Sequence, residues 1–449
     1  MANSSTYIYR TPSSTGSNTI STFSAWLKKT VNGSYEGIFT SVYETGEFFE
    51  INFESSDSLE VRAKVSSSYV LRKITTRKFR DNSAFYHIVV AIDTTDGTAE
   101  DRCKIYVNGT RETSFSTNTN PSQNQNLNMN TAGSYQHRIG RDEWTTPAYY
   151  DGLMAHVHWV DGTAYTASTF GESDSVSGIW KPKTNPTVTY GTNGFFFKFE
   201  NSGNMDLDSS SNNHTFTTGG TLTQNVDTPS NNFATLNPLH KTGNTALNAL
   251  TNGNLTYTGH SGSSYSGTYS TLAASSGKYY AEFKCTGGGG AVDMMIGVGN
   301  GITNTTAPGA SANDMVVFGY NGKYYAGSGG VTYGVAWVSG DIIGVAMDLD
   351  NNKLYVSKNG SYMNSGDPTS GSSGTGAITL ATSSTGFYHF LIGDYGGDGT
   401  PICESNFGQG YFGTTQVASA GTAPSEGGIF EYDCPSGYQA LCTKGINSF

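Results

Sequence analysis

Apolar and polar residues alternate in short runs along most of this chain, and this pattern constrains the fold more than any other feature. The runs TISTFSAWLKK (19–29), FFEINFE (48–54) and LEVRAKV (59–65) are examples, and clusters of Gly, Asn, Asp and Ser separate them. A period of two sends successive side chains to opposite faces of a β-strand, and the polar clusters are typical of turns between antiparallel strands. No segment longer than a turn or two has helical spacing. The pattern predicts an all-β protein.

Length and composition indicate how these strands are organised. The chain has 449 residues, of which only 14% are charged, and it contains 57 glycines, 28 tyrosines and 23 phenylalanines. Such a composition favours turns and strands over helices, and the length suits two large sandwiches with connecting segments. We therefore predict two tandem antiparallel β-sandwich domains over 1–221 and 246–412, a connection over 222–245 and a C-terminal extension over 413–449.

The connection and the extension are assigned because the alternation is lost there. Residues 222–245 contain two prolines, several asparagines and no sustained period, as is typical of linkers. The extension begins rich in Gly, Thr and Ala and continues into FEYDCPSGYQALC (430–442). Two roles are open for it: it packs back on the second sandwich, or it serves as a docking arm.

Three local motifs predict individual elements. Asn108-Gly109 predicts a type I′ hairpin turn, because both residues tolerate a positive φ. FFFKFE (195–200) is a continuous apolar run that fits a buried strand, and GVAMDLDNNKLYVSKNG (344–360) predicts a hairpin whose turn spans residues 350–352.

Net charge and hydropathy disfavour several partners. The formal charge is −11 and no basic stripe is visible, so the overall field would repel a nucleic acid. The start of the chain lacks a basic end followed by an apolar core, and no stretch approaches eighteen consecutive apolar residues. We therefore expect neither nucleic-acid binding, nor a secretion signal, nor membrane insertion.

Five cysteines are too few and too scattered for a disulfide framework. Cys103 and Cys285 lie in strand-like runs and are expected to be small core residues. Cys434 and Cys442 bracket CPSGYQALC, so they either pair in an oxidising medium or remain two free thiols.

The first half of the chain resembles the laminin-G-like, concanavalin A-like jelly roll. The resemblance is carried by FYHIVVAIDTT (85–95), CKIYVNGTRETSF (103–115) and YYDGLMAHVHWVDG (149–162). The segment that begins FFFKFE is similar to the element that opens such a module, yet here it follows the closing strand. Either the jelly roll is circularly permuted or the segment adds an extra strand to the sheet.

The second half resembles the SPRY sandwich in GKYYAEFKC (277–285), IGVGNG (296–301), residues 340–360 and ESNFGQ (404–409). The tandem order, together with GIWKPK (178–183), TPSNNFATLNP (228–238) and the ending that contains CPSGY, is similar to virion structural proteins of marine bacteriophages. The resemblance implies a protein of the virion surface, on fibre, tail or capsid. Its implied partners are other virion proteins, copies of itself in a homo-oligomer, and host cell-surface glycans.

Related jelly rolls include glycoside hydrolases, so neighbouring carboxylates are relevant. Glu47, Glu50, Glu54 and Asp57 lie close together in sequence. Retaining hydrolysis needs two carboxyl groups about 5 Å apart. Glu50 and Glu54 have the right parity but lie ~13 Å apart along a strand, and the residues do not match the Glu-x-Asp-x-x-Glu pattern of the hydrolase branch. We predict a non-enzymatic protein, with a glycan depolymerase as the alternative.

Two metal sites are conceivable. His156 and His158 in MAHVHWV have strand spacing and, with Asp151 nearby, could bind zinc, although two ligands on one strand are half a tetrahedral site and a satisfied polar face explains them as well. Asp206 and Asp208, with Asn212 in the same loop, resemble the calcium-bearing region of some laminin-G-like modules. Asx-turns explain these loop residues more simply.

Sugar binding is the more natural use of the surface of such a fold. Trp144, Tyr149 and Tyr150 lie in the polar loop RDEWTTPAYYDG, where exposed rings could stack on a sugar while Arg141 and Asp142 bind its hydroxyls. In the second half, the predicted ligand-binding residues are Tyr324, Tyr325 and Trp337. In both places the rings could instead cap the sandwich or contact a neighbouring subunit.

Overall fold

The chain separates into two compact units, Met1–Gln224 and Asn225–Phe449. The computed structural model describes residues 5–44, 46–142, 147–175, 177–244, 249–260, 262, 264–287, 292–302, 307–395 and 400–449. Within these residues strands predominate, and the helical elements are α1 (Thr443–Ile446) and four short 3-10 turns, Ala99–Asp101, Ala167–Thr169, Met363–Ser365 and Gly371–Ser373. The all-β prediction is confirmed.

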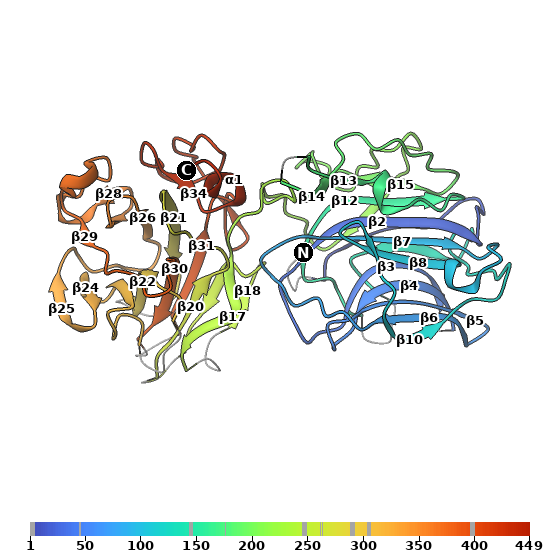
Figure 1. Ribbon diagram of the computed structural model, residues 1–449, viewed down its shortest axis with the longest axis horizontal. Coiled ribbons are helices and arrows are strands. Elements are labelled where there is room, and N and C mark those ends of the chain that lie inside the picture. Colours follow the sequence, from blue (N-terminus) through green and yellow to red (C-terminus); the bar gives the residue numbers. More distant parts are fainter. Residues whose placement is uncertain are drawn as a thin grey trace. The chain divides into compact units, whose positions relative to one another are not determined.

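The first unit is a sandwich of two antiparallel sheets, which Figure 1 shows as two layers. The larger sheet has eight strands in the order β10 (Phe115–Thr119), β6 (Ser68–Thr75), β5 (Leu59–Val65), β4 (Glu47–Phe53), β3 (Glu36–Glu44), β11 (Gln136–Ile139), β1 (Tyr7–Arg10) and β16 (Thr217–Gly219). The smaller sheet has six, in the order β15 (Phe195–Phe197), β12 (Gly152–Asp161), β2 (Ile20–Lys29), β7 (Tyr86–Asp93), β8 (Cys103–Val107) and β9 (Thr110–Arg111). A separate pair is formed by β13 (Gly171–Ser173) and β14 (Trp180–Pro182).

Period-two alternation builds the core of this unit. Phe49, Ile51 and Phe53 of β4 belong to the same buried cluster as Phe23 and Ala25 of β2. Since these residues sit at every second position, the side chains between them point to the opposite face of each sheet. The apolar residues therefore fill the space between the sheets, and the face of the eight-stranded sheet that points away from it is left for polar residues.

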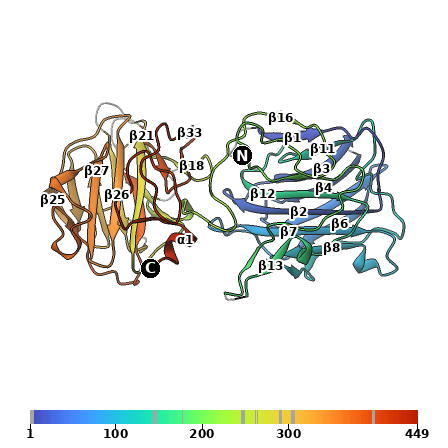
Figure 2. The same ribbon diagram turned by 90° about the horizontal axis from the view of Figure 1, so that it is seen from above.

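The second unit is also a two-sheet sandwich. One sheet has seven strands in the order β17 (Leu236–Gly243), β20 (Ser266–Ser270), β30 (His389–Asp394), β22 (Met294–Gly299), β23 (Asp314–Phe318), β24 (Lys323–Ala326) and β25 (Ser328–Thr332). The other follows the order β18 (Ala249–Thr251), β19 (Thr256–Thr258), β31 (Ile402–Asn406), β21 (Lys278–Cys285), β26 (Ile342–Asp348), β27 (Lys353–Lys358) and β28 (Ser361–Tyr362), with β29 (Ile378–Thr379) on β27 and β34 (Gln439–Ala440) on β21, nine strands in all. A small hairpin joins β32 (Tyr411–Phe412) to β33 (Thr415–Gln416). Figure 2 shows β21, β26 and β27 side by side.

The C-terminal extension packs on the outer face of the nine-stranded sheet. Tyr280 of β21 and Tyr355 of β27 point away from the core and form a second buried cluster with Phe430 and Tyr438 of the extension. The strand β34, which belongs to the extension, pairs in parallel with β21 of the sheet. Of the two roles left open by the sequence, packing on the second sandwich is the one observed.

The predicted connection over 222–245 is wrong for most of its length. The unit boundary falls at Gln224/Asn225, and β17 pairs antiparallel with β20 within the seven-stranded sheet. Phe233 and Leu236 are buried in the second unit. The prolines misled the prediction because Pro238 sits where the β17 register is irregular, between Leu236 and Lys241, and an edge strand tolerates such a break.

The local motifs are confirmed. Asn108 and Gly109 have φ values of 47° and 83° between β8 and β9, and β26 pairs with β27 in the predicted hairpin. Phe195–Phe197 forms the buried strand β15, which pairs with β12 at the edge of the six-stranded sheet. The extra-strand interpretation of this segment therefore matches the observed pairing.

All five cysteines are buried free thiols. Cys103 and Cys285 lie in the two cores, as predicted. Cys434 and Cys442 do not pair with each other; the Cys442 Sγ instead accepts the Gly445 N–H.

Among the described residues, no helix has the length and apolar character needed to cross a membrane.

Candidate functional site

A row of polar side chains crosses the outer face of the eight-stranded sheet in the first unit. Cross-strand pairing places its members opposite one another in the order Tyr9, Arg138, Thr40, Glu50, Arg62 and Arg72. We call these six residues the charged row. They lie on the outer face because their neighbours along each strand, such as Phe49 and Val61, fill the core.

Glu50 and Arg62 form the centre of the charged row. The Arg62 guanidinium donates to Glu50 Oε2 through Nε at 2.9 Å and lies 2.8 Å from it through a terminal nitrogen. Tyr35 Oη donates to Glu50 Oε1 at 2.9 Å and also accepts from Arg62. Burial raises the pKa of Glu50 to about 7, although the charge of Arg62 opposes the rise.

A second carboxylate continues the charge alternation. Glu60 accepts from Arg72 Nε at 2.7 Å and from Asn52 Nδ2 at 3.2 Å, and its Oε2 lies 3.6 Å from Arg62. The ion pairs therefore link Glu50 to Arg62, Arg62 to Glu60, and Glu60 to Arg72, although Glu60 and Arg62 lie on the same strand. Glu50, Glu60 and Arg62 are buried, and the opposite charge beside each offsets part of the cost of that burial.

Three tyrosines form an aromatic patch at the other end of the charged row. Tyr7 stacks on Tyr9 with ring centroids 5.4 Å apart and lies 6.1 Å from Tyr149. The Arg141 guanidinium lies 4.7 Å from the Tyr7 centroid and 5.6 Å from that of Tyr149. We call Tyr7, Tyr9, Tyr149 and Arg141 the aromatic patch. Two of the residues predicted to bind sugar, Arg141 and Tyr149, are thus brought together.

The other predicted residues of this loop have different fates. Tyr150 is 1% exposed and belongs to the core, so its assignment as a surface ring is wrong. Consecutive residues of an extended segment point in opposite directions, so Tyr149 and Tyr150 cannot share a surface. Asp142 is buried and its Oδ1 accepts the Ala148 N–H at 2.6 Å, while Trp144 lies outside the described residues.

The aromatic site predicted in the second unit is not formed. Trp337 is 0% exposed in the core, which contradicts its assignment as a ligand-binding residue. Tyr324 packs against the same core, at 6.2 Å from the ring of Tyr333. Tyr325 points to the opposite face of the sheet, where its hydroxyl accepts from Asn321 Nδ2 at 3.0 Å. The three rings therefore have no common surface.

The His156 and His158 pair does not keep strand spacing. A register irregularity interrupts β12 between Ala155 and His158, and His156 has a φ of 47°. His158 is buried, with its Nδ1 2.9 Å from the Tyr190 hydroxyl and its ring stacked on Phe196. These contacts favour the interpretation of a satisfied polar residue, and the described residues contain no cluster of three or more His, Cys, Asp or Glu that could hold a metal.

The loop predicted to bind calcium is held by hydrogen bonds within the protein. Asp208 Oδ1 accepts the N–H groups of Phe196 and Ser210, each at 2.9 Å, and its Oδ2 accepts that of His214 at 2.8 Å. Asp206 accepts from Thr218, and Asn212 donates to two backbone carbonyls. These contacts are of the turn-forming kind that the sequence left as the alternative.

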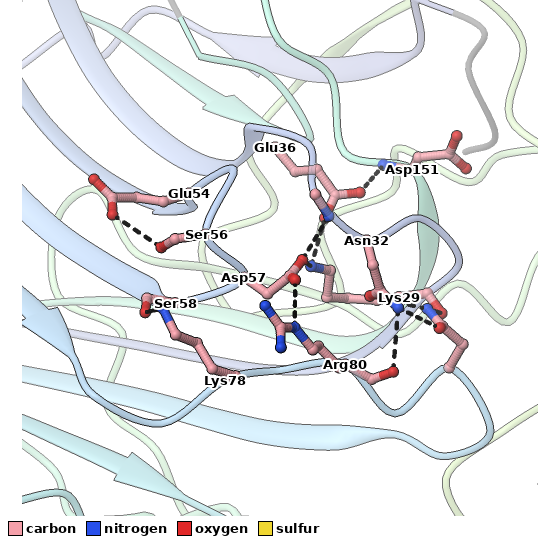
Figure 3. Close-up of polar contacts among 12 residues, drawn as sticks. Lys29, Asn32, Glu36, Glu54, Ser56, Asp57, Ser58, Lys78, Arg80 and Asp151 are labelled. Atoms are coloured by element: carbon pink, nitrogen blue, oxygen red, sulfur yellow. Dashed lines mark hydrogen bonds and ion pairs between the residues drawn. The ribbon is translucent and has the colours of Figure 1, made fainter. Parts of the chain in front are cut away.

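The four neighbouring carboxylates have four different sets of partners. Glu47 accepts the Ser66 N–H, Glu50 belongs to the charged row, and Glu54 accepts from Ser56 (Figure 3). Asp57 accepts from Arg80 Nε at 2.8 Å, from Lys29 Nζ at 3.3 Å and from the Gly33 N–H at 2.7 Å. They do not form one constellation.

Asp57 belongs to a cluster at the rim of the first unit that Figure 3 shows around Lys29. The Lys29 ammonium is fully buried between Asp57 and Glu36, whose Oε2 is 3.4 Å away. Burial raises the pKa of Glu36 to about 8, whereas hydrogen bonds from Arg80 and Gly33 outweigh burial and lower the pKa of Asp57. Lys29 already supplies the cation between these carboxylates, so the cluster joins loops and does not offer an open ligand site.

Sequence reasoning missed Tyr7, Tyr9, Tyr35, Arg62 and Arg72. The available signal was the alternation of apolar and polar residues: Glu50 in FFEINFE and Arg62 in LEVRAKV occupy polar positions of their strands. This alternation shows that a side chain points away from the core, but it does not reveal which strand pairs with which. The register that aligns the charged row is therefore known only from the structure.

Comparison with known proteins extends these observations. No curated protein matches the chain. Among solved structures, the SPRY domain of human HERC1 is similar at 16% identity, with a TM-score of 0.30, over 38% of this chain and 96% of that chain. A further human SPRY domain is similar at 18% identity, with a TM-score of 0.26, over 34% of this chain and 90% of that chain.

A family model described as the concanavalin A-like lectin/glucanases superfamily, of the laminin G type, matches residues 3–169. This range includes nearly every strand of both sheets of the first unit. Over residues 3–169 the first unit is therefore similar to laminin-G-like domains of the concanavalin A-like lectin/glucanase superfamily.

Proposed function

We propose that this chain is a bacteriophage virion surface protein whose first unit binds carbohydrate on the outer face of its eight-stranded sheet. The observation that carries the binding proposal is the aromatic patch beside the charged row. Stacked tyrosine rings offer flat apolar surface to the C–H face of a sugar, and the Arg141 guanidinium beside Tyr7 and Tyr149 is a donor for its hydroxyls. The superfamily of lectins and glucanases that matches this domain supports the same class of ligand.

A glycan array probed with the purified full-length chain tests the binding proposal. We expect retention on a subset of glycans, and a loss of about 10-fold in affinity, or roughly 1.4 kcal/mol, for Tyr149→Ala and for Tyr9→Ala. Tyr320→Ala is the matched control, because this ring is 58% exposed in the second unit. Absence of retention, or unchanged affinity in both patch variants, would contradict the proposal.

The virion assignment rests on the motifs GIWKPK, TPSNNFATLNP and CPSGYQALC. In the structure these motifs make contacts within the chain: Trp180 donates to His87, and the Ala234 N–H donates to the Leu441 carbonyl. Mass spectrometry of purified particles should detect this chain, and cryo-EM of the particle should place it as an oligomer on head, tail or fibre; its absence would refute the assignment.

A purely architectural decoration protein is the neighbouring proposal. It predicts tight binding to other virion proteins with no retention of the chain on the glycan array. Both proposals predict that the chain is found in purified particles. Only the carbohydrate-binding proposal predicts retention on the glycan array.

A glycan depolymerase is the second candidate, and one feature of Glu50 favours it. Its carboxyl group has a pKa raised by burial to about 7, with Asp142 adding to the rise, and a raised pKa is what the general acid of a glycoside hydrolase needs. Release of reducing ends from host polysaccharide, abolished by Glu50→Gln, would establish this activity. We propose the non-enzymatic function, for which no release is expected with either protein.

A further inference from the structure

A cavity of about 260 Å³ lies on the outer face of the nine-stranded sheet in the second unit. Three tyrosines line it, Tyr280, Tyr362 and Tyr432, together with Ser357 and Asp433. Lys, Arg and His are absent from its described lining. Since ligand pockets for drug-sized molecules span about 300–1,000 Å³, this cavity suits a single small group.

The floor of the cavity is a row of residues on neighbouring strands, one of which is a glycine and so has no side chain. Glu282, Gly344, Ser357 and Tyr362 lie opposite one another on β21, β26, β27 and β28. Gly344 supplies the gap, into which Tyr280 leans: a Cβ at this position would lie 2.6 Å from Tyr280 Oη and closer still to Ser357 Oγ. The missing side chain therefore lets the tyrosine ring lie low across the sheet.

The C-terminal extension forms the opposite wall. The buried Glu282 carboxylate accepts the N–H groups of Glu431 and Tyr432, both at 2.8 Å, and the Tyr280 hydroxyl at 3.2 Å. Tyr432 then rests on Gly360, where a Cβ would lie 2.6 Å from its ring. One buried acid thus positions two of the three tyrosines.

Charge indicates which ligand the cavity prefers. Asp433 belongs to the lining, which contains no described cation, and the buried Glu282 lies beneath it with a pKa raised by burial to about 7. The nearest ionisable groups therefore favour a cation over an anion. Tyrosine faces attract cations through their quadrupole, most strongly when the cation is weakly hydrated.

We propose that this cavity binds a small alkylated ammonium group, of the kind carried by choline or by a trimethylated lysine side chain. The tyrosines contact the methyl groups, and Asp433 supplies the opposite charge. An anion would be repelled by Asp433. A neutral sugar would gain nothing from the net negative charge.

Titration of the full-length chain with choline and with its neutral isostere 3,3-dimethyl-1-butanol tests this proposal by calorimetry. The two molecules have the same shape and hydroxyl and differ in charge. We expect choline to bind about 10-fold more tightly than the isostere, since cation–π contacts at such sites have this magnitude. Tyr432→Ala should remove the difference, Tyr432→Phe should keep it, and Tyr320→Ala should leave both affinities unchanged.

Other outcomes are decisive in the opposite direction. Equal binding of the isostere would show an apolar cavity without cation preference, and the absence of saturable binding by both molecules would also overturn the proposal. If Tyr432→Ala does not fold, Asp433→Asn serves in its place, and it should weaken choline selectively. Phosphocholine and Nε-trimethyllysine amide then separate the sources: tighter binding of trimethyllysine indicates a protein partner, and tighter binding of phosphocholine indicates a choline-bearing surface.

Discussion

The two units present opposite chemistry on comparable surfaces. On the outer face of the eight-stranded sheet, Glu50 and Arg62 form an ion pair within the charged row. On the outer face of the seven-stranded sheet, Met295, Val316 and Leu391 form a buried apolar cluster, and Pro308 lies against this face at Gly267 and Gly393. In both sandwiches every second residue of a strand fills the core between the sheets. The two units therefore differ only in the outer face of the sheet, which points away from that core.

This difference separates an outer face that buries paired charges from an outer face that buries apolar side chains. Charged side chains that neutralise one another can be buried, as Glu50, Glu60 and Arg62 are. An apolar outer face is stable only beneath another part of the protein. The second unit therefore uses loops and the C-terminal extension to cover its sheets, and its proposed cavity forms at the edge of such a cover.

The largest effect is expected from Arg62→Ala in the charged row. Removing this guanidinium leaves Glu50 and Glu60 as buried carboxylates without their shared cation, which should lower the free energy of unfolding of the first unit by about 3–5 kcal/mol. Hydrogen exchange followed by mass spectrometry reports each unit separately. Arg62→Lys keeps the charge, so it should lower the free energy of unfolding by less. A loss below about 1 kcal/mol for Arg62→Ala would show that the charged row is not a coupled network.

The next effect is a pH dependence of the first unit. Burial raises the pKa of Glu50 to about 7 from an ordinary value of 4.5, so the folded state holds this proton more tightly than the unfolded state. The stabilisation is complete below pH 4.5 and is lost as the pH rises through 7. Relative to Glu50→Gln, the native chain should lose up to about 3 kcal/mol between pH 4.5 and 8.

Urea denaturation of both proteins at several pH values measures this difference. Glu36 titrates in the same direction with a pKa of about 8, but it is present in both proteins and cancels. Parallel curves for the two proteins would show that folding does not raise the pKa of Glu50.

An intermediate effect is expected from Gly344→Ala in the second unit. The added methyl group would press on Tyr280 and Ser357, and overpacking of this kind costs about 1–3 kcal/mol. Thermal unfolding should register the loss together with weaker choline binding. Gly97→Ala is the matched control, because its Cβ would meet no atom within 4 Å, and an equal loss there would mean that the close approach at Gly344 is irrelevant.

The smallest effect is expected from Arg80→Ala at the rim of the first unit. Its guanidinium lies 2.8 Å from Asp57 but is 59% exposed, and exposed ion pairs contribute about 0.2–1 kcal/mol. Asp57 also keeps its contacts with Lys29 and Gly33. A loss comparable to that of Arg62→Ala would mean that exposure does not distinguish the two arginines.

Parts of the candidate site were predictable, and the errors have one cause. Arg141 and Tyr149 were identified as surface residues of a polar loop, and they do meet in the aromatic patch. Tyr150 was predicted as an exposed ring because it follows Tyr149 in a polar loop, and Trp337 because SPRY modules bind partners through loops, yet both are buried. Closeness in sequence is a poor guide in strands, because each step along the chain reverses the face.

The sequence by itself determined the sandwiches, the hairpin turns and the parity of each strand, because alternation and the conformational freedom of Asn and Gly act over a few residues. Only the tertiary structure decided which strands are neighbours, so it alone aligned Glu50 with Arg62 and brought Tyr432 to Tyr280 across 152 positions of the chain. Pairing between distant strands depends on the packing of the whole core, and the sequence of one strand carries little information about the identity of its partner.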